Sequence, residues 1–161
     1  MNSMSVVENQ IIETWRINNR VNLFTIENIP DEALKATLST RGGRDIARQF
    51  AHMHNTRVWR LETFIKKSKI TLVKFENDES PVKKRLLTAF QKSGTAMELF
   101  LLYCIHNGGH VSNFKRGVVP LLGYLISHEA HHRGNILLTM KQCGFKLPDT
   151  LKWGIWEWNK R

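Results

Sequence analysis

The chain has 161 residues, of which 42% are hydrophobic and 24% charged, and its formal net charge is +10. The length suits a single domain over residues 1–161 with a real core, and the composition excludes an intrinsically disordered chain. The basic residues are spread along the chain without a nucleic-acid-binding motif, which disfavours nucleic acid and leaves small anionic molecules as partners that the charge would attract.

The first two predicted helices follow clear start signals. Ser5 and Glu8 stand three residues apart, the spacing of a capping box, and an apolar helical pattern continues from them until it stops before Pro30. A Gly-Gly pair then precedes a second helical pattern, which runs from about Asp45 to Phe64.

Two further helices complete the pattern. The third is expected to start at Ser80-Pro81, where serine can cap the first turn, and to end at an Asn-Gly-Gly turn. The fourth begins near Val119-Pro120 and runs to Cys143, with Gly144 placed as its C-terminal cap.

Four amphipathic helices of about 20 residues, without any alternating strand pattern, predict an all-α four-helix bundle. The short C-terminal tail carries Trp153, Trp156 and Trp158, which we expect to close one end of the bundle or to form a subunit interface. No apolar stretch reaches the ~20 residues of a membrane-spanning helix, and the N-terminus lacks a signal-peptide pattern. Cys104 and Cys143 lack CxxC spacing and read as free thiols, so we expect a cytoplasmic protein.

The fourth helix contains a dense group of imidazoles. His128 and His132 are four residues apart, which places them on one helical face where both can reach one metal ion. His131 points about 100° away from His132 and is expected at the rim of such a site. Glu129 is expected either to pair with Arg133 or to orient a metal ligand from behind.

A third ligand must come from elsewhere in the chain. The candidates are His52 and His54 in the second helix and His106 and His110 in the loop before the fourth. The apolar stripe of the second helix puts His54 on the core face and so slightly favours it. His52, however, heads a second stripe with Thr56 and Trp59 that could line a cleft, so the pattern leaves both open.

Two segments, FAHMHN in the second helix and HEAHHRGNI in the fourth, resemble those of the DinB superfamily. Its members are four-helix bundles with a three-histidine metal site, and the likeness covers nearly the whole chain. Carried over position by position, the resemblance implies His52, His128 and His132 as the ligands. Characterised members include transferases and isomerases that use bacillithiol or mycothiol, and both the resemblance and the aromatic tail lead us to expect a homodimer.

Three neutral imidazoles leave a divalent ion with its full charge and an open coordination position. Zinc, nickel, manganese or iron would accept these ligands, and such an ion can activate a thiol or a water molecule. We therefore expect a metal-dependent enzyme that acts on a small-molecule substrate, either as a thiol S-transferase with a low-molecular-weight thiol or as a hydrolase. The alternative is a metal-binding, stress-associated interaction module without catalysis.

The segment from His128 to His132 also satisfies HExxH, the zinc motif of metalloproteases in which Glu129 would be the general base, with Glu157 as a third ligand. That motif normally lies beside a sheet that holds the peptide, and no sheet is predicted, so we disfavour the protease. Arg57 and Arg133 could bind substrate carboxylates, but we expect interior salt bridges from them.

Overall fold

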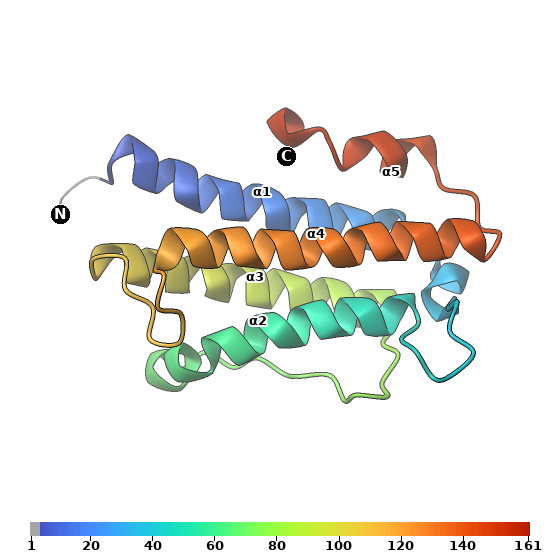
Figure 1. The fold of residues 1–161 in the computed structure, drawn as a ribbon, viewed down its shortest axis with the longest axis horizontal. Coiled ribbons are helices and arrows are strands. Elements are labelled where there is room, and N and C mark those ends of the chain that lie inside the picture. Colours follow the sequence, from blue (N-terminus) through green and yellow to red (C-terminus); the bar gives the residue numbers. More distant parts are fainter. Residues whose placement is uncertain (1–3) are drawn as a thin grey trace.

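The computed structural model describes residues 4–161 and confirms the four-helix bundle (Figure 1). Over these residues the chain contains helices and no strand. The elements are four long helices, a short helix and two 3-10 turns: α1 (Val6–Asn28), η1 (Asp31–Lys35), α2 (Ile46–Ser68), α3 (Lys83–His106), α4 (Val118–Gln142), α5 (Asp149–Gly154) and η2 (Trp158–Lys160).

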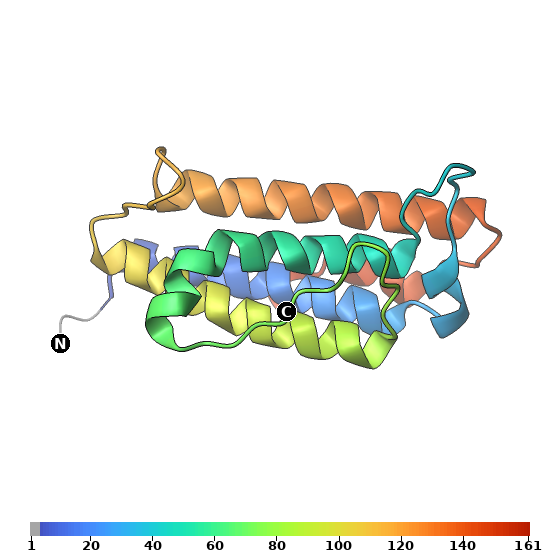
Figure 2. The same cartoon turned by 90° about the horizontal axis from the view of Figure 1, so that it is seen from below.

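The four long helices lie side by side, and α1 and α4 run opposite to α2 and α3 (Figure 1). Around the bundle, α3 packs against both α1 and α2, and α4 packs against the same two helices from the other side. Because α2 and α3 run in the same direction, residues 69–82 must return along the bundle between them, as Figure 2 shows from below. None of the helices in residues 4–161 has the combination of length and apolarity needed to cross a membrane.

Two of the predicted helix starts are confirmed. Ser5 caps α1, and its side chain accepts a hydrogen bond from the Glu8 backbone while Glu8 accepts one from the Ser5 backbone, which completes the capping box. Asp45 caps α2 by accepting a hydrogen bond from the Arg48 backbone at 2.8 Å. Unpaired amides of both first turns are thus satisfied by residues next to them in the sequence.

The predicted start of α3 is wrong. The helix begins at Lys83, and its N-cap is Val82, which has no capping side chain. The Ser80 hydroxyl is instead buried without a hydrogen-bond partner in the described part of the chain. Serine capping therefore does not set this helix start, and the preceding segment is held to the bundle by buried Phe75.

The predicted end of α4 is confirmed. Gly144 adopts a φ of 83°, and its amide donates to the carbonyl of Lys141 while the Phe145 amide donates to that of Met140. These two bonds form a Schellman motif, in which the left-handed conformation strongly favours glycine.

The core consists of two apolar clusters along the bundle. One contains Met53 of α2 and Ile136 of α4, and the other contains Leu61 of α2 and Leu125 of α4. Polar side chains occupy the turns between these positions, so a buried polar layer separates the two clusters. Cys104 packs in the second cluster, and both cysteines are free thiols, as predicted.

The C-terminal tail does not close an end of the bundle. It turns back along α1 and α4, with Leu151 fully buried against the bundle (Figure 1). The indoles point outward, because Trp153 is 60% exposed and Trp156 is 73% exposed. Leucine, and not tryptophan, therefore anchors the tail, and the expected role of the tryptophans in a subunit interface stays a prediction.

Candidate metal centre

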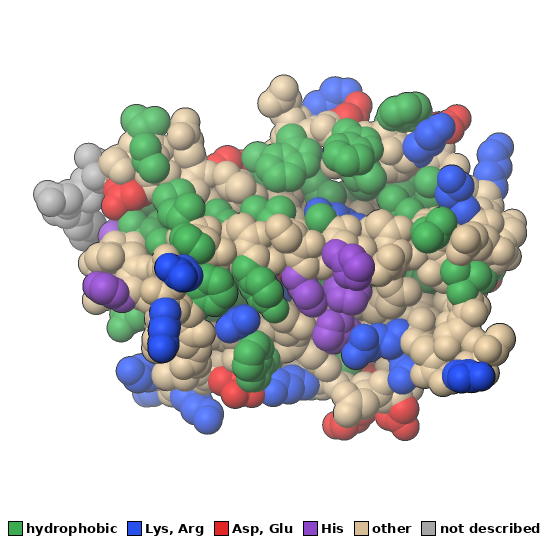
Figure 3. Space-filling view, viewed as in Figure 1, with side chains coloured by type: hydrophobic (Ala, Val, Ile, Leu, Met, Phe, Trp, Pro, Cys, Tyr) green, Lys and Arg blue, Asp and Glu red, His purple; other side chains and the backbone are tan. Residues whose placement is uncertain are grey.

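Three histidines from two helices meet at the bundle surface. His52 lies on α2, and His128 and His132 lie about one turn apart on α4. One ring nitrogen from each lies within 4.8 Å of the other two. The ring centroids are 5.3 Å apart for His52 and His128, 4.8 Å for His52 and His132, and 4.7 Å for His128 and His132. In Figure 3 the imidazoles gather in one patch over the middle of α4 and α2.

The environment keeps these imidazoles neutral. Burial lowers the pKa of His52 to about 4, and the positive charge of Arg44 adds to this shift. Burial also lowers the pKa of His132 to about 4, with further contributions from the neighbouring imidazoles. The pKa of His128 is lowered chiefly by burial as well. At neutral pH each ring therefore has an unprotonated nitrogen, the form that binds a metal ion.

Unsatisfied ring nitrogens indicate that the group fits an ion. The Nδ1 atoms of His128 and His132 are buried and have no hydrogen-bond partner among residues 4–161. Ligand nitrogens at 2.0–2.1 Å from a tetrahedral ion stand about 3.3 Å apart, so small side-chain rotations would close the observed triangle. The described residues contain no other group of histidine, cysteine or carboxylate side chains with such geometry.

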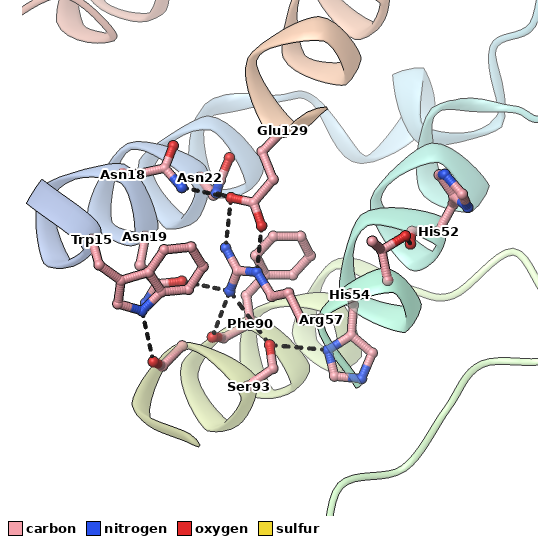
Figure 4. A network of polar contacts seen from close by, with 12 residues as sticks. Trp15, Asn18, Asn19, Asn22, His52, His54, Arg57, Phe90, Ser93 and Glu129 are labelled. Carbon is pink, nitrogen blue, oxygen red and sulfur yellow. Dashed lines mark hydrogen bonds and ion pairs between the residues drawn. The ribbon is translucent and has the colours of Figure 1, made fainter. Parts of the chain in front are cut away.

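His54 does not join the cluster, although the apolar stripe of α2 slightly favoured it. Its ring is buried in the core, where Nδ1 pairs with the Ser93 hydroxyl at 3.1 Å and Nε2 with the Val73 carbonyl at 2.8 Å. Because a carbonyl only accepts, Nε2 carries the proton and Nδ1 accepts from Ser93. Figure 4 shows His54 directed toward Ser93 while His52 lies apart from this network.

Glu129 pairs with Arg57, and the predicted pairing with Arg133 is wrong. The Arg57 guanidinium donates two hydrogen bonds to the carboxylate, at 2.6 Å from Nε and 2.9 Å from the second nitrogen (Figure 4). Both side chains are buried, with exposures of 0% and 1%. Burial by itself raises the pKa of Glu129, but the charge and hydrogen bonds of Arg57 outweigh it and hold the pKa below its usual value. The expected interior salt bridge of Arg57 is confirmed.

Asparagines of α1 complete this buried layer. Asn18 and Asn22 each donate a hydrogen bond of 2.6 Å to the Glu129 carboxylate. Their amide oxygens accept from Arg133, at 3.0 Å and 2.7 Å, so Arg133 bonds to amides and makes no salt bridge within residues 4–161. Sequence reasoning missed these asparagines, although both fall within the turns that follow buried Trp15, where polar residues interrupt the apolar face.

The metalloprotease interpretation of HExxH is wrong for this fold. Its general base would be Glu129, but that carboxylate is buried against Arg57 and the α1 asparagines, inside the bundle. Glu157, the expected third ligand, instead pairs with Lys160 in the C-terminal tail. A base enclosed by a guanidinium cannot take a proton from a water molecule at the imidazole cluster.

The remaining predicted residues lie around or away from the cluster. His131 is exposed at its rim, with its ring centroid 5.3 Å from that of His132 and its Nε2 paired with the Asn135 amide. His106 and His110 are exposed at the end of α3 and in the following loop, as expected for solvated residues.

Thr56 and Trp59, which we expected to line a cleft, form no hydrogen bond with the three imidazole rings in the described structure. The Thr56 hydroxyl donates to the His52 carbonyl at 3.0 Å, within the helix. Trp59 is 54% exposed and, with Thr56, lines a depression beside residues 74–77.

An aromatic and basic group on the other side of the cluster was not predicted. The Tyr124 ring stacks on that of His128 with centroids 6.1 Å apart and planes 19° from parallel. The Arg60 guanidinium lies 4.9 Å from the centroid of the same Tyr124 ring. The four-residue spacing of Tyr124 and His128 on one helix could have revealed the first contact.

Comparisons with known proteins agree with this architecture. The model of the DinB family matches residues 4–157, which is nearly the whole chain. Neither the curated proteins nor the solved structures gave a match to the chain. Since the family model spans all four long helices and the three clustered histidines, the chain belongs to the DinB family.

Proposed function

We propose that the protein is a metal-dependent enzyme in which His52, His128 and His132 bind one divalent ion, and that it activates a low-molecular-weight thiol for transfer to an electrophilic small molecule. The observation that carries this proposal is the convergence of three neutral imidazoles from α2 and α4 at the surface. A divalent ion bound there would lower the pKa of a coordinated thiol or water and so supply a nucleophile at neutral pH.

The surroundings of the cluster favour a thiol over water. A side-chain base assists hydrolysis by accepting a proton from the attacking water, whereas a coordinated thiol, which is intrinsically more acidic than water, has less need of one. The nearest acid in the sequence, Glu129, is engaged by Arg57 inside the bundle. The hydrolase alternative would have to use His131, which lies at the rim near His132.

The decisive experiment measures metal content and thiol conjugation on the same preparations. Purified protein loaded with zinc, nickel, manganese or iron would be mixed with a thiol and monochlorobimane, and conjugate fluorescence followed. We expect one ion per chain and metal-dependent conjugation, both lost in His132→Ala and both retained in the control His106→Ala, which alters an exposed histidine outside the cluster. Stoichiometric metal binding without turnover of any thiol or ester would instead support the non-catalytic interaction module.

We also propose that the protein forms a homodimer through the face of α4 and the tail. Leu138, Trp153 and Trp156 are exposed there, and a groove of about 500 Å³ lies between α4 and the tail. Exposed apolar patches of this kind often mark an interface. Light scattering of the wild type and of Trp156→Glu tests this: a dimer that becomes a monomer in the variant supports it, and a monomeric wild type contradicts it.

A further inference from the structure

A cavity of about 500 Å³ lies between the C-terminal halves of α2 and α3 and the loop that follows α3. Three aromatic side chains line it, and basic and polar side chains stand among them. Cys104 also lines the cavity, but burial raises the pKa of its thiol to about 11, so this thiol is protonated at neutral pH and is no nucleophile. The lining residues that matter here are Arg60, Phe64, Lys67, Phe100, Tyr103 and Ser112.

Arg60 lies at one edge of this cavity and has no counter-ion in the described part of the chain. Its guanidinium lies over three aromatic rings, with its central carbon 4.4 Å from the Trp59 ring centroid, 4.9 Å from Tyr124 and 5.6 Å from Phe114. It takes part in none of the ion pairs formed within residues 4–161. Its Nε atom is buried and has no hydrogen-bond partner among these residues.

Arg57, one turn earlier on α2, has a guanidinium whose hydrogen bonds are made within the bundle. It donates to both oxygens of Glu129 and to the amide oxygen of Asn19. The aromatic rings hold the Arg60 guanidinium in position, but no carboxylate or amide oxygen of the described residues accepts a hydrogen bond from it. A buried donor without an acceptor is costly, so a held and unpaired guanidinium is suited to an anion from outside the protein.

The Tyr124 ring connects Arg60 to the metal centre. It stacks on the His128 ring and also lies beneath the Arg60 guanidinium. An anion held by Arg60 would therefore sit one aromatic ring away from a proposed metal ligand. The apolar walls formed by Phe64, Phe100 and Tyr103 extend from Arg60 in the direction of the α3 loop.

We infer that this cavity binds an apolar carboxylate, with its carboxylate paired to Arg60 and its apolar body against the aromatic walls. A carboxylate matches the planar guanidinium through two parallel hydrogen bonds. An apolar body gains free energy by covering the cavity walls. The inference rests on the proposed function in that it names the substrate class of the same site: a small molecule that carries a carboxylate and an apolar group.

The test uses two ligands of matched shape on chelator-treated, metal-free protein. Binding of 2-naphthoate and of neutral 2-naphthamide would be measured by calorimetry, because the two ligands have nearly the same shape and only the first carries a charge. We expect the wild type to bind the carboxylate about 10-fold more tightly than the amide, the size of effect expected for a charge-assisted pair. Arg60→Gln should abolish this preference, and Arg60→Lys should keep part of it.

Two controls locate the effect. Arg116→Gln removes the same charge from an exposed residue of the nearby loop and should leave the preference intact. Ser112→Trp fills the rim of the cavity without changing charge and should weaken both ligands alike. A preference that persists in Arg60→Gln, binding that Ser112→Trp does not affect, or a lack of binding by the wild type would each overturn the inference.

The metal-free measurement separates this inference from the proposed function. Carboxylate selectivity that depends on Arg60, in a protein without metal-dependent turnover, would support the cavity and contradict the proposed enzyme. Metal-dependent conjugation, together with a carboxylate preference that is the same in the wild type and in Arg60→Gln, would support the proposed enzyme and overturn only the cavity inference.

Discussion

Glu129 accepts two hydrogen bonds from Arg57, and this buried pair joins α4 to α2 within two turns of the clustered histidines. Glu129 directly follows His128 in the sequence, and Arg57 lies five residues after His52. The pair therefore fixes the position of the two helices relative to each other at the height where the imidazoles must meet. Its geometry links the stability of the bundle to the shape of the histidine cluster.

Glu129→Gln should strongly destabilise the fold. The amide keeps the shape of the side chain but leaves the Arg57 charge buried and uncompensated, which costs about 3–5 kcal/mol. The free energy of unfolding, measured in urea by circular dichroism, should fall by this amount. Glu98→Gln breaks the surface pair with Arg16 and should cost less than about 1 kcal/mol. Similar losses in the two variants would contradict the role of the buried pair.

Metal binding should distinguish the two histidines of α2. His52→Ala should lose the bound ion, because it removes one of the three convergent ring nitrogens. His54→Ala should keep the stoichiometry of one ion per chain but unfold more easily, because it removes the ring nitrogen that accepts the Ser93 hydrogen bond and opens a cavity in the core. Elemental analysis and thermal melts of the two variants check this. Loss of the ion in His54→Ala but not in His52→Ala would contradict the assignment of His52 as the third ligand.

The free energy of unfolding should decrease as the pH is lowered below 6.5, partly because of His54. Burial lowers its pKa from the usual 6.5 to about 4 in the folded protein. Between these values the unfolded chain binds a proton that the folded chain does not, so acid favours unfolding, and above pH 6.5 the effect vanishes.

The expected contribution of His54 is about 1.4 kcal/mol per pH unit at most. The pKa values of the three clustered histidines are lowered as well, so the comparison must be made with a variant. In chelator-treated His54→Gln, the loss of unfolding free energy between pH 6.5 and 4.5 should be about 2 kcal/mol smaller than in the wild type. Parallel pH curves for the two proteins would show that His54 does not titrate as described.

Replacement of two helical glycines, Gly94 and Gly134, by alanine should change the free energy of unfolding in opposite directions. A Cβ at Gly94 would approach the Asn19 side chain to 2.2 Å, and Asn19 accepts a hydrogen bond from Arg57. Gly94→Ala should therefore cost about 1–3 kcal/mol. Gly134 on α4 has nothing within 4 Å of the added atom, so Gly134→Ala should stabilise the helix by about 0.5–1 kcal/mol. Urea unfolding of both variants checks the signs.

The sequence alone determined those features that depend on neighbouring residues. The number of long helices, the capping box of Ser5 and Glu8 and the glycine cap at Gly144 were all predicted, because each rests on hydrogen bonds or periodicity within a few residues. The placement of His128 and His132 on one face follows in the same way from helical spacing. The predicted start of α3 and the expectation that the tail tryptophans close an end of the bundle were wrong, because both depend on contacts with other segments.

Only the tertiary structure decided which polar groups the bundle encloses. The pattern of α2 slightly favoured His54 as the third ligand, but a core position suits a histidine when Ser93 and the Val73 carbonyl, both distant in the sequence, satisfy its ring. The partner of Glu129 is Arg57, 72 residues away, and not Arg133 on its own helix. A buried polar side chain must find its partner wherever the fold brings one, and spacing along a single helix does not contain that information.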